Sequence, residues 1–280
     1  MRYPLPESAE SLRVSVVQLN AQDDVAANLR ALAPLVARSK AEGARFVALP
    51  ENFAYIGGDA GRLAAAEELH SEKPGAICAA LCELAAAHEL WLLGGGMPEK
   101  VAGNVLPFNT SVLISPQGKI EKTYRKIHLF DVDLADGTRL RESEKTQGGD
   151  EVVVTSVDEI PVGLAICYDL RFPELFRAQV ARGARLLTVP AAFTVTTGRD
   201  HWLPLLRARA IENECFVLAP AQWGAHPLGR TTYGKSVILD PWGDVLAQVG
   251  EGIGVATATC DFRYQDRVRT QLPCLSHRKL

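Results

Sequence analysis

The stretch GARFVALPENF at residues 43–53 returns in altered form as GARLLTVPAAF at residues 183–193. Each copy places a short apolar run before a proline, which is the pattern of a buried strand that ends at a turn. A second pair of segments repeats as well, because NTSVLISPQGKI (109–120) resembles GKSVILDPWGDV (234–245). The segments recur in the same order, so the sequence predicts two halves with a common arrangement of elements.

Strand-like and helix-like runs alternate within each half. The expected strands are 12–19, 45–49, 90–95, 161–167, 185–189, 215–220 and 253–259, and the expected helices are 24–42, 74–89, 173–182 and 200–214. The strands are near-continuous apolar runs, which indicates that both faces of each sheet are covered. Two sheets facing each other, with helices outside, would cover them, so we predict a layered α/β fold. Residues 129–150 are polar and are expected to form an irregular functional loop.

The composition favours a single globular unit. The chain has 280 residues, 47% of them hydrophobic, and a net charge of −3. No linker or low-complexity segment separates the halves, so we expect one domain over residues 1–280. Scattered Lys and Arg favour neither nucleic acid nor an anionic membrane as a partner. The six cysteines lack the dense spacing of a small secreted scaffold, so we expect free thiols and a cytoplasmic location.

Metal and nucleotide motifs are weak. Cys78 and Cys82 are four residues apart on a predicted helix, but their face is apolar and no second pair accompanies them. The six histidines form neither HxxxH nor HExxH, and the glycines at 94–96 lack the spacing of a phosphate-binding loop. We therefore expect no metal site.

One difference between the copies could carry chemistry, since Pro50 is followed by Glu51 while Pro190 is followed by Ala191. Lys126 and Cys167 also follow apolar strands, and strand ends in α/β sheets are where catalytic groups gather. Alone, each has an ordinary explanation. Cys167 could be packed in a strand, Glu51 could cap the next segment and Lys126 could be solvated.

Three motifs combine these residues: PENF (50–53), YRKIHLFD (124–131) and CYDLRFPE (167–174). In this order and at these separations they resemble the Glu, Lys and Cys motifs of the nitrilase superfamily, the carbon–nitrogen hydrolases. The resemblance covers nearly the whole chain. The longer runs LPENFAYIG, KIHLFDVDL, RESE and LLRARAIENE resemble the branch that contains deaminated glutathione amidases, and the omega-amidase branch shares many of these features.

The resemblance implies an α-β-β-α sandwich and a catalytic triad of Glu51, Lys126 and Cys167. Cys167 would be the nucleophile, Glu51 its base and later the acid, and Lys126 would stabilise the oxyanion. The backbone N–H of Tyr168 would be a second oxyanion donor. No metal or organic cofactor is required.

The family also has a second glutamate, which the run RESE places at Glu142. We expect it to position the substrate amide and Lys126, although Glu142 could also be an ordinary loop acid beside Arg141.

Substrate contacts are expected around the same strand ends. Arg171, four residues after Cys167, has the planar fork that binds a carboxylate, unless it only pairs with Glu174 or Asp169. The other expected lining residues are Phe193, Thr196, Thr197 and His128.

The expected function is hydrolysis of a small linear amide to a carboxylate and ammonia through a thioester acyl-enzyme, with deaminated glutathione as the substrate in metabolite repair. The alternatives are an omega-amidase acting on alpha-ketoglutaramate, a carbamoylase or nitrilase, and a catalytically silent binding protein. The family also implies a homodimer or higher homo-oligomer. Its interface would use the helices at 173–182 and 200–214, and the tail 262–280 would lie on the partner.

Overall fold

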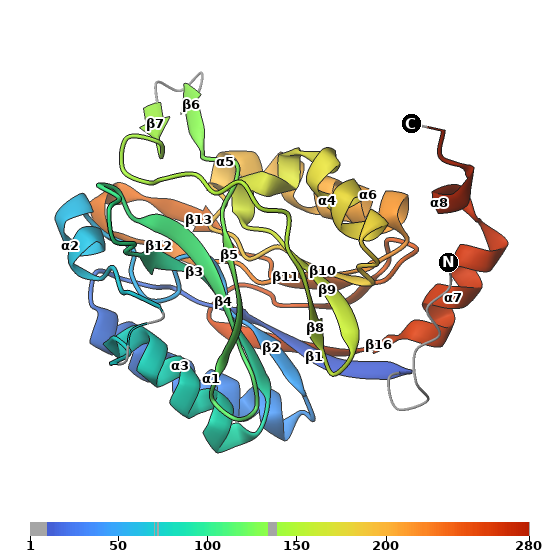
Figure 1. Ribbon diagram of the computed structural model, residues 1–280, viewed down its shortest axis with the longest axis horizontal. Coiled ribbons are helices and arrows are strands. Elements are labelled where there is room, and N and C mark those ends of the chain that lie inside the picture. The colour runs from blue at the N-terminus through green and yellow to red at the C-terminus, as the bar shows by residue number, and fades with distance from the viewer. Residues whose placement is uncertain (1–9, 70, 72, 134–138, 280) are drawn as a thin grey trace.

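The protein is described by a computed structural model that covers residues 10–69, 71, 73–133 and 139–279. Two six-stranded sheets face each other between two layers of helices (Figure 1). The first sheet has the order β16 (Gly254–Asp261), β1 (Ser11–Gln18), β2 (Phe46–Ala48), β3 (Trp91–Glu99), β4 (Phe108–Ile114) and β5 (Ile120–Arg125). The second has the order β15 (Val245–Gln248), β14 (Val237–Leu239), β11 (Phe216–Ala219), β10 (Leu186–Thr188), β9 (Ile160–Leu164) and β8 (Val154–Val157).

Helices cover the outer faces of both sheets. On the first sheet these are α1 (Val25–Ala41) and α3 (Ala76–His88), and on the second they are α4 (Pro173–Ala181) and α6 (Leu203–Asn213). The helix α1 begins where the Asp24 carboxylate accepts the Ala27 N–H at 2.9 Å, which satisfies one free donor of the first turn. The expected four-layer α-β-β-α sandwich is confirmed.

The predicted repeat is confirmed by the strand order. The strand β2 is hydrogen-bonded in parallel between β1 and β3, and β10 in the same way between β9 and β11. Each half then adds an antiparallel hairpin, β4–β5 in one and β14–β15 in the other. Each also has one antiparallel strand, β16 or β8, beside its first parallel strand. The stretches 43–53 and 183–193 thus occupy equivalent central positions.

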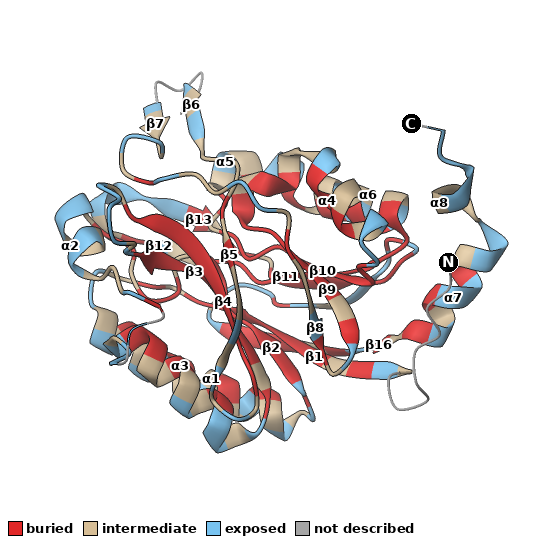
Figure 2. Ribbon diagram, viewed as in Figure 1, coloured by how far each residue is buried: buried red, intermediate tan, exposed pale blue. Residues whose placement is uncertain are grey.

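The core follows the two-residue period of the strands. Val14 and Val16 of β1 face the second sheet, while Val17 faces the layer of α1 and α3. Figure 2 shows the strands as the most continuously buried part of the fold. Because the strands are covered on both faces, their sequences are apolar throughout rather than alternating.

Several short elements were not expected from the sequence. The predicted irregular loop at 129–150 contains a hairpin of β6 (Asp131–Asp133) and β7 (Arg139–Arg141), while its residues 134–138 lie outside the described part. The other additions are α2 (Asp59–Ala64), α5 (Val195–Thr197), the π-helical turn η3 (Gly198–Trp202), the pair β12 (Trp223–Ala225) and β13 (Thr231–Tyr233), and the turns η2 (Cys167–Arg171) and η4 (Pro227–Gly229).

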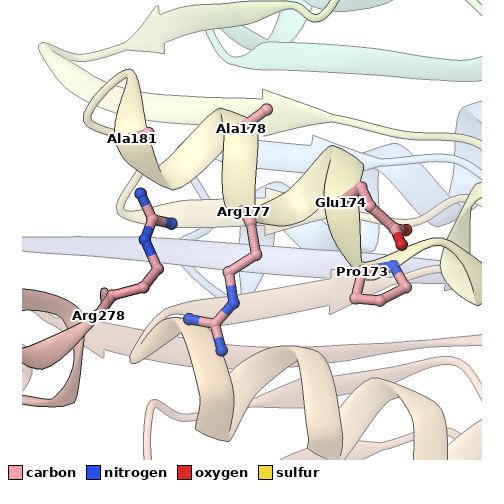
Figure 3. A pocket seen from close by; sticks show the side chains of 6 residues that line it. All are labelled: Pro173, Glu174, Arg177, Ala178, Ala181 and Arg278. Atoms are coloured by element: carbon pink, nitrogen blue, oxygen red, sulfur yellow. The ribbon is translucent and has the colours of Figure 1, made fainter. Parts of the chain in front are cut away.

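The C-terminal tail begins with a helix, and its packing on a partner subunit stays a prediction. Residues 262–271 form α7 (Phe262–Gln271), which packs on its own chain, where Arg185 Nε donates to Gln265 at 2.7 Å. The short helix α8 (Cys274–His277) follows. A groove separates this end of the chain from α4, lined by Pro173, Glu174, Arg177, Ala178, Ala181 and Arg278 (Figure 3). None of the helices in the described part of the chain has the length and apolar character needed to cross a membrane.

Candidate active site

The ends of β2 and β10 meet at the centre of the sandwich. Gly95 of β3 lies against both, since a Cβ there would sit 2.0 Å from the Leu49 carbonyl oxygen and 2.4 Å from Pro190 Cβ. Only glycine permits this approach. The Cys167 N–H donates to the Pro190 carbonyl at 2.8 Å, which ties the end of β9 to the same place. The repeated prolines therefore bring the Glu51 and Cys167 segments together.

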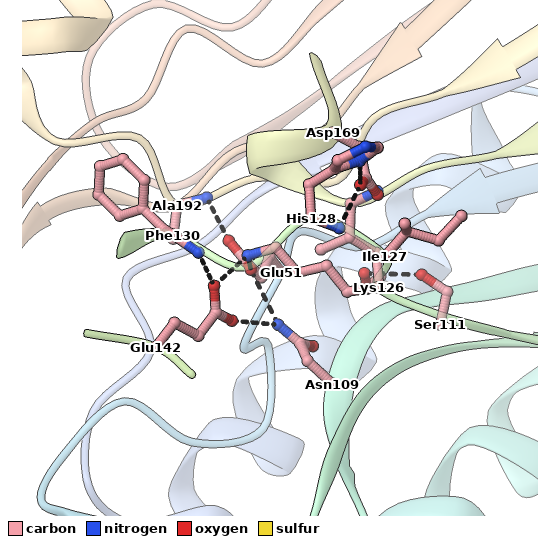
Figure 4. A network of polar contacts seen from close by, with 12 residues as sticks. Glu51, Asn109, Ser111, Lys126, Ile127, His128, Phe130, Glu142, Asp169 and Ala192 are labelled. Atoms are coloured by element: carbon pink, nitrogen blue, oxygen red, sulfur yellow. Dashed lines mark hydrogen bonds and ion pairs between the residues drawn. The ribbon is translucent and has the colours of Figure 1, made fainter. Parts of the chain in front are cut away.

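Glu51 is buried, with both carboxylate oxygens engaged (Figure 4). Its Oε1 accepts Asn109 Nδ2 at 2.9 Å and Lys126 Nζ at 3.0 Å, and its Oε2 accepts the Ala192 N–H at 3.1 Å. Ala192 belongs to the second copy of the repeat, where the chain has no carboxylate of its own. One half thus supplies the acid and the other supplies a backbone donor that holds it.

Lys126 lies between two carboxylates. Its side chain is 2% exposed, and its Nζ is 3.0 Å from Glu51 Oε1 and 2.8 Å from Glu142 Oε2. Burial lowers the pKa of Lys126, but the charges of Glu142 and Glu51 raise it more, so its pKa lies above the ordinary value. Burial raises the pKa of Glu142, but the charge and the hydrogen bond of Lys126 lower it by more, so its pKa lies below the ordinary value. Lys126 is therefore a fixed cation and Glu142 a fixed anion.

Glu142 follows β7 directly, so the hairpin delivers it to the site. Its Oε2 also accepts the Phe130 N–H at 2.7 Å. Asn109, which sequence reasoning missed, joins the two acids, because its Nδ2 lies 2.9 Å from Glu51 Oε1 and 3.4 Å from Glu142 Oε1. A signal was present in the repeat, where Asn109 corresponds to Gly234 and is polar in one copy only.

Cys167 begins the turn η2 with a positive φ of 49°, an unfavourable conformation for a residue with a side chain. A residue held this way at a strand end is over-determined by its surroundings, which is common at functional sites. The side chain is 9% exposed. Tyr168, whose N–H is the expected second oxyanion donor, follows Cys167 directly in this turn.

The pKa of the Cys167 thiol depends on burial and on the charges of Glu51 and Lys126. Burial raises the pKa of Cys167, the charge of Glu51 raises it further, and the charge of Lys126 opposes the rise. Hydrogen bonding to Glu51 also raises this pKa, and the Ala192 N–H, which donates to Glu51 Oε2 at 3.1 Å, lowers it. The resting sulfur is thus a neutral thiol with a carboxylate next to it, able to give up its proton when a base removes it.

Asp169 holds the nucleophile turn and was also missed as a site residue. Its fully buried carboxylate accepts the Ile166 N–H at 2.8 Å and the Tyr124 hydroxyl at 2.7 Å. On the other oxygen it contacts the His128 N–H at 3.1 Å and His128 Nδ1 at 2.7 Å. Asp169 therefore joins the segment after β5, which carries Lys126, to the segment that carries Cys167.

His128 contacts the carboxylate that holds the nucleophile turn. Its ring faces Asp169 and stacks on Phe172 at 3.7 Å between centroids, and lining of the substrate pocket by His128 stays a prediction. Figure 4 shows His128 next to Asp169.

Arg171 lies on the Cys167 side of the site. Its guanidinium stands 5.9 Å from the Tyr168 ring centroid and 5.5 Å from that of Phe193, and it contacts His201 Nδ1 at 3.3 Å. Among the described residues it pairs with neither Glu174 nor Asp169, so the structural ion pair considered from the sequence is not formed.

The three expected lining residues after β10 differ in how far they are buried. Phe193 is buried and its ring lies 4.9 Å from that of Trp202. The Thr197 N–H donates to Thr194 Oγ1 at 3.3 Å, which caps α5, and the two hydroxyls lie 2.9 Å apart. Thr196 is exposed. The described residues hold no group of three or more His, Cys, Asp or Glu side chains placed to share a metal ion.

The sandwich and its Glu, Lys and Cys cluster define a class of enzyme. Residues 13–270 match the carbon–nitrogen hydrolase family model, and the chain belongs to this family. It is a hydrolase that acts on carbon–nitrogen bonds.

Relatives narrow the comparison. The chain is 41% identical to a deaminated glutathione amidase of Synechocystis, over 94% of this chain and 97% of that protein. The crystal structure of the Caenorhabditis elegans NitFhit protein matches with a TM-score of 0.88 and 37% identity, over 97% of this chain and 66% of that one. Saccharomyces cerevisiae Nit3, a member of branch 10 of the nitrilase superfamily, matches with a TM-score of 0.87 and 29% identity, over 96% and 97% of the two chains.

Proposed function

We propose that this protein is a cysteine-dependent amidase that hydrolyses deaminated glutathione. The observation that carries the proposal is the buried cluster in which Lys126 contacts Glu51 and Glu142 beside the Cys167 thiol. The name of the Synechocystis relative supports the choice of substrate. We propose further that residues 1–280 work as one carbon–nitrogen hydrolase domain, which the match over residues 13–270 supports.

Acylation begins with the neutral thiol. Glu51 takes the proton from Cys167 Sγ as the sulfur attacks the amide carbonyl, and a carbon–sulfur bond forms. The carbonyl oxygen becomes an oxyanion, which Lys126 Nζ and the Tyr168 N–H stabilise. Glu51 then gives its proton to the amide nitrogen, the carbon–nitrogen bond breaks, and an amine leaves. Glu142 accepts a hydrogen bond from Lys126 Nζ at 2.8 Å, which holds the ammonium group in place.

Deacylation repeats these steps with water. Glu51 takes a proton from water as the water oxygen attacks the thioester carbonyl. Lys126 Nζ and the Tyr168 N–H again stabilise the oxyanion. The carbon–sulfur bond breaks, the acid leaves, and the proton returns from Glu51 to the sulfur. Because Lys126 lies between two carboxylates, it stays positively charged, and this charge stabilises the oxyanion in both steps.

The substrate decides what is released. Deaminated glutathione is a keto form of glutathione, so its scissile amide joins a keto-acid acyl group to the amine of a dipeptide. Its hydrolysis releases an amine, whereas the ammonia expected from the sequence is the product of a primary amide such as alpha-ketoglutaramate. In both substrates the acyl part carries a carboxylate, which Arg171 would bind with Phe193 beneath it.

Assembly and location follow the same reasoning. We propose a homodimer formed through α4 and α6, supported by Ile211, an apolar side chain of α6 that is 45% exposed. The six free cysteines support a reducing, cytoplasmic environment.

The test compares two substrates on the purified protein. Release of the keto acid should be followed from deaminated glutathione and from alpha-ketoglutaramate under identical conditions. We expect the larger kcat/KM with deaminated glutathione. A larger value with alpha-ketoglutaramate would make the protein an omega-amidase, and no release from either would refute the proposed activity.

A further inference from the structure

A second arginine, Arg62, lies at the edge of the candidate site. Its helix α2 is tied to the turn that carries Glu142. Lys145 Nζ lies 2.9 Å from both carboxylate oxygens of Asp59, and the Lys145 N–H donates to the Glu142 carbonyl at 3.1 Å. Residues three apart share a helix face, so Arg62 projects from the same side of α2 as Asp59. It therefore faces the segment of Glu142.

Arg62 is a half-buried cation whose Nε lacks a hydrogen-bond partner in the described part of the chain. Its Nε is shielded from solvent and meets no acceptor among the described residues. Burial lowers the pKa of Arg62, the carboxylates of Glu142, Glu51 and Asp59 oppose that fall, and the charge of Arg230 adds to it. Arg62 Nε is thus an unused donor on the side of α2 that faces the site. A buried donor without an acceptor is costly unless a ligand supplies one.

The two arginines of the site lie on different sides of it. Arg171 contacts Tyr168, Phe193 and His201, which belong to the Cys167 side. Arg62 interacts electrostatically with Glu142 and Glu51, on the side of the site that holds these two carboxylates. Since Glu51 protonates the departing nitrogen in the proposed mechanism, the leaving group extends toward Arg62.

We propose that Arg62 forms a subsite for a carboxylate on the leaving group. This inference rests on the proposed function and names its substrate class: amides that carry a carboxylate on each side of the scissile bond. Deaminated glutathione has one carboxylate on its acyl part and another at the end of the leaving dipeptide. Alpha-ketoglutaramate has only the first. The arginine fork binds a carboxylate through two parallel hydrogen bonds, which gives the site its selectivity.

The experiment replaces Arg62 and varies the leaving group. Arg62→Gln and Arg62→Lys are assayed on deaminated glutathione, on its analogue with a C-terminal carboxamide, and on alpha-ketoglutaramate. Arg62→Gln should raise KM for deaminated glutathione by about 10- to 100-fold more than for the other two substrates, the range expected for one charge-assisted pair. Arg62→Lys should recover part of this loss. The wild type should also prefer the acid to its carboxamide.

The control is Arg30→Gln, which removes an exposed arginine of α1 and should change none of these values. Equal losses of Arg62→Gln on all three substrates would overturn the subsite, because Arg62 would then only support Glu142.

A binding measurement keeps this inference separate from the proposed activity. Cysteinylglycine, the leaving dipeptide, is titrated calorimetrically into Cys167→Ala and into the double variant with Arg62→Gln. We expect affinity to fall at least about tenfold in the double variant. Equal affinities would overturn the subsite whether or not the enzyme turns over deaminated glutathione. Circular dichroism establishes that each variant is folded, and Arg62→Lys replaces Arg62→Gln if the latter is not.

Discussion

Replacing Asp169 with asparagine tests how the nucleophile turn is held. The four contacts of the carboxylate come in two pairs, and each pair includes one backbone N–H, from Ile166 or from His128. An amide has one acceptor oxygen, so in either orientation its NH2 group faces one of these N–H donors. A buried donor left without an acceptor costs about 1–3 kcal/mol, and the remaining contacts lose their ionic acceptor. We expect Asp169→Asn to lower the free energy of unfolding by about 2–4 kcal/mol.

The assay combines urea unfolding with steady-state kinetics. Ile166 directly precedes Cys167, so displacement of this turn should also lower kcat, by about 100-fold for a shift on the order of 1 Å. The matched control is Asp266→Asn, whose carboxylate pairs with Arg185 but is 62% exposed, and which should cost less than about 1 kcal/mol. A loss of stability for Asp169→Asn below about 0.5 kcal/mol, with kcat unchanged, would refute this reasoning.

Two further variants test the charges of the site. Arg171→Ala should raise KM for an anionic amide, by the equivalent of about 2–4 kcal/mol of binding free energy, and should affect a neutral amide of similar size much less. Arg171→Lys should recover only part of this loss. Equal losses on both amides would contradict the role of Arg171 in binding the carboxylate. Because Lys126 lowers the pKa of Glu142 in the folded state, the stability that Glu142 contributes is present above its unfolded pKa of about 4.3 and is lost as pH falls through the lower folded value. Urea unfolding at pH 6 and at pH 3.5 should therefore show a smaller loss on acidification for Glu142→Gln than for the wild type, and an equal loss would contradict the pairing with Lys126.

The repeat made much of the fold predictable. A duplicated strand that ends in proline fixes two equivalent sheets, and strands that are apolar throughout must be covered on both faces. The short elements escaped prediction because their sequences carry little periodic signal. The hairpin β6–β7 has three described residues in each strand, and α2 has six residues. Such lengths are fixed by tertiary contacts, such as that between Lys145 and Asp59, rather than by local propensity.

The site was predictable where a residue is reactive and stands out from its repeated copy. Glu51 has no counterpart at Ala191, and Cys167 and Lys126 lie in recognisable motifs. Asn109 and Asp169 were missed because their roles depend on which donors and acids the fold brings to them. The contact of His128 with Asp169 was not predicted for the same reason, since its sequence position gives its neighbour Lys126 but not the direction of its ring.

The central claim is that Cys167 forms a thioester with the acyl part of the substrate. Rapid quench of the enzyme with deaminated glutathione, followed by intact mass and peptide mass spectrometry, measures this adduct directly. We expect the acyl mass on the peptide that contains Cys167, no adduct and no turnover in Cys167→Ala, and almost no turnover in Cys167→Ser, because a hydroxyl is a far weaker nucleophile beside a carboxylate base. An adduct on another of the six cysteines, or turnover by Cys167→Ala, would contradict the account.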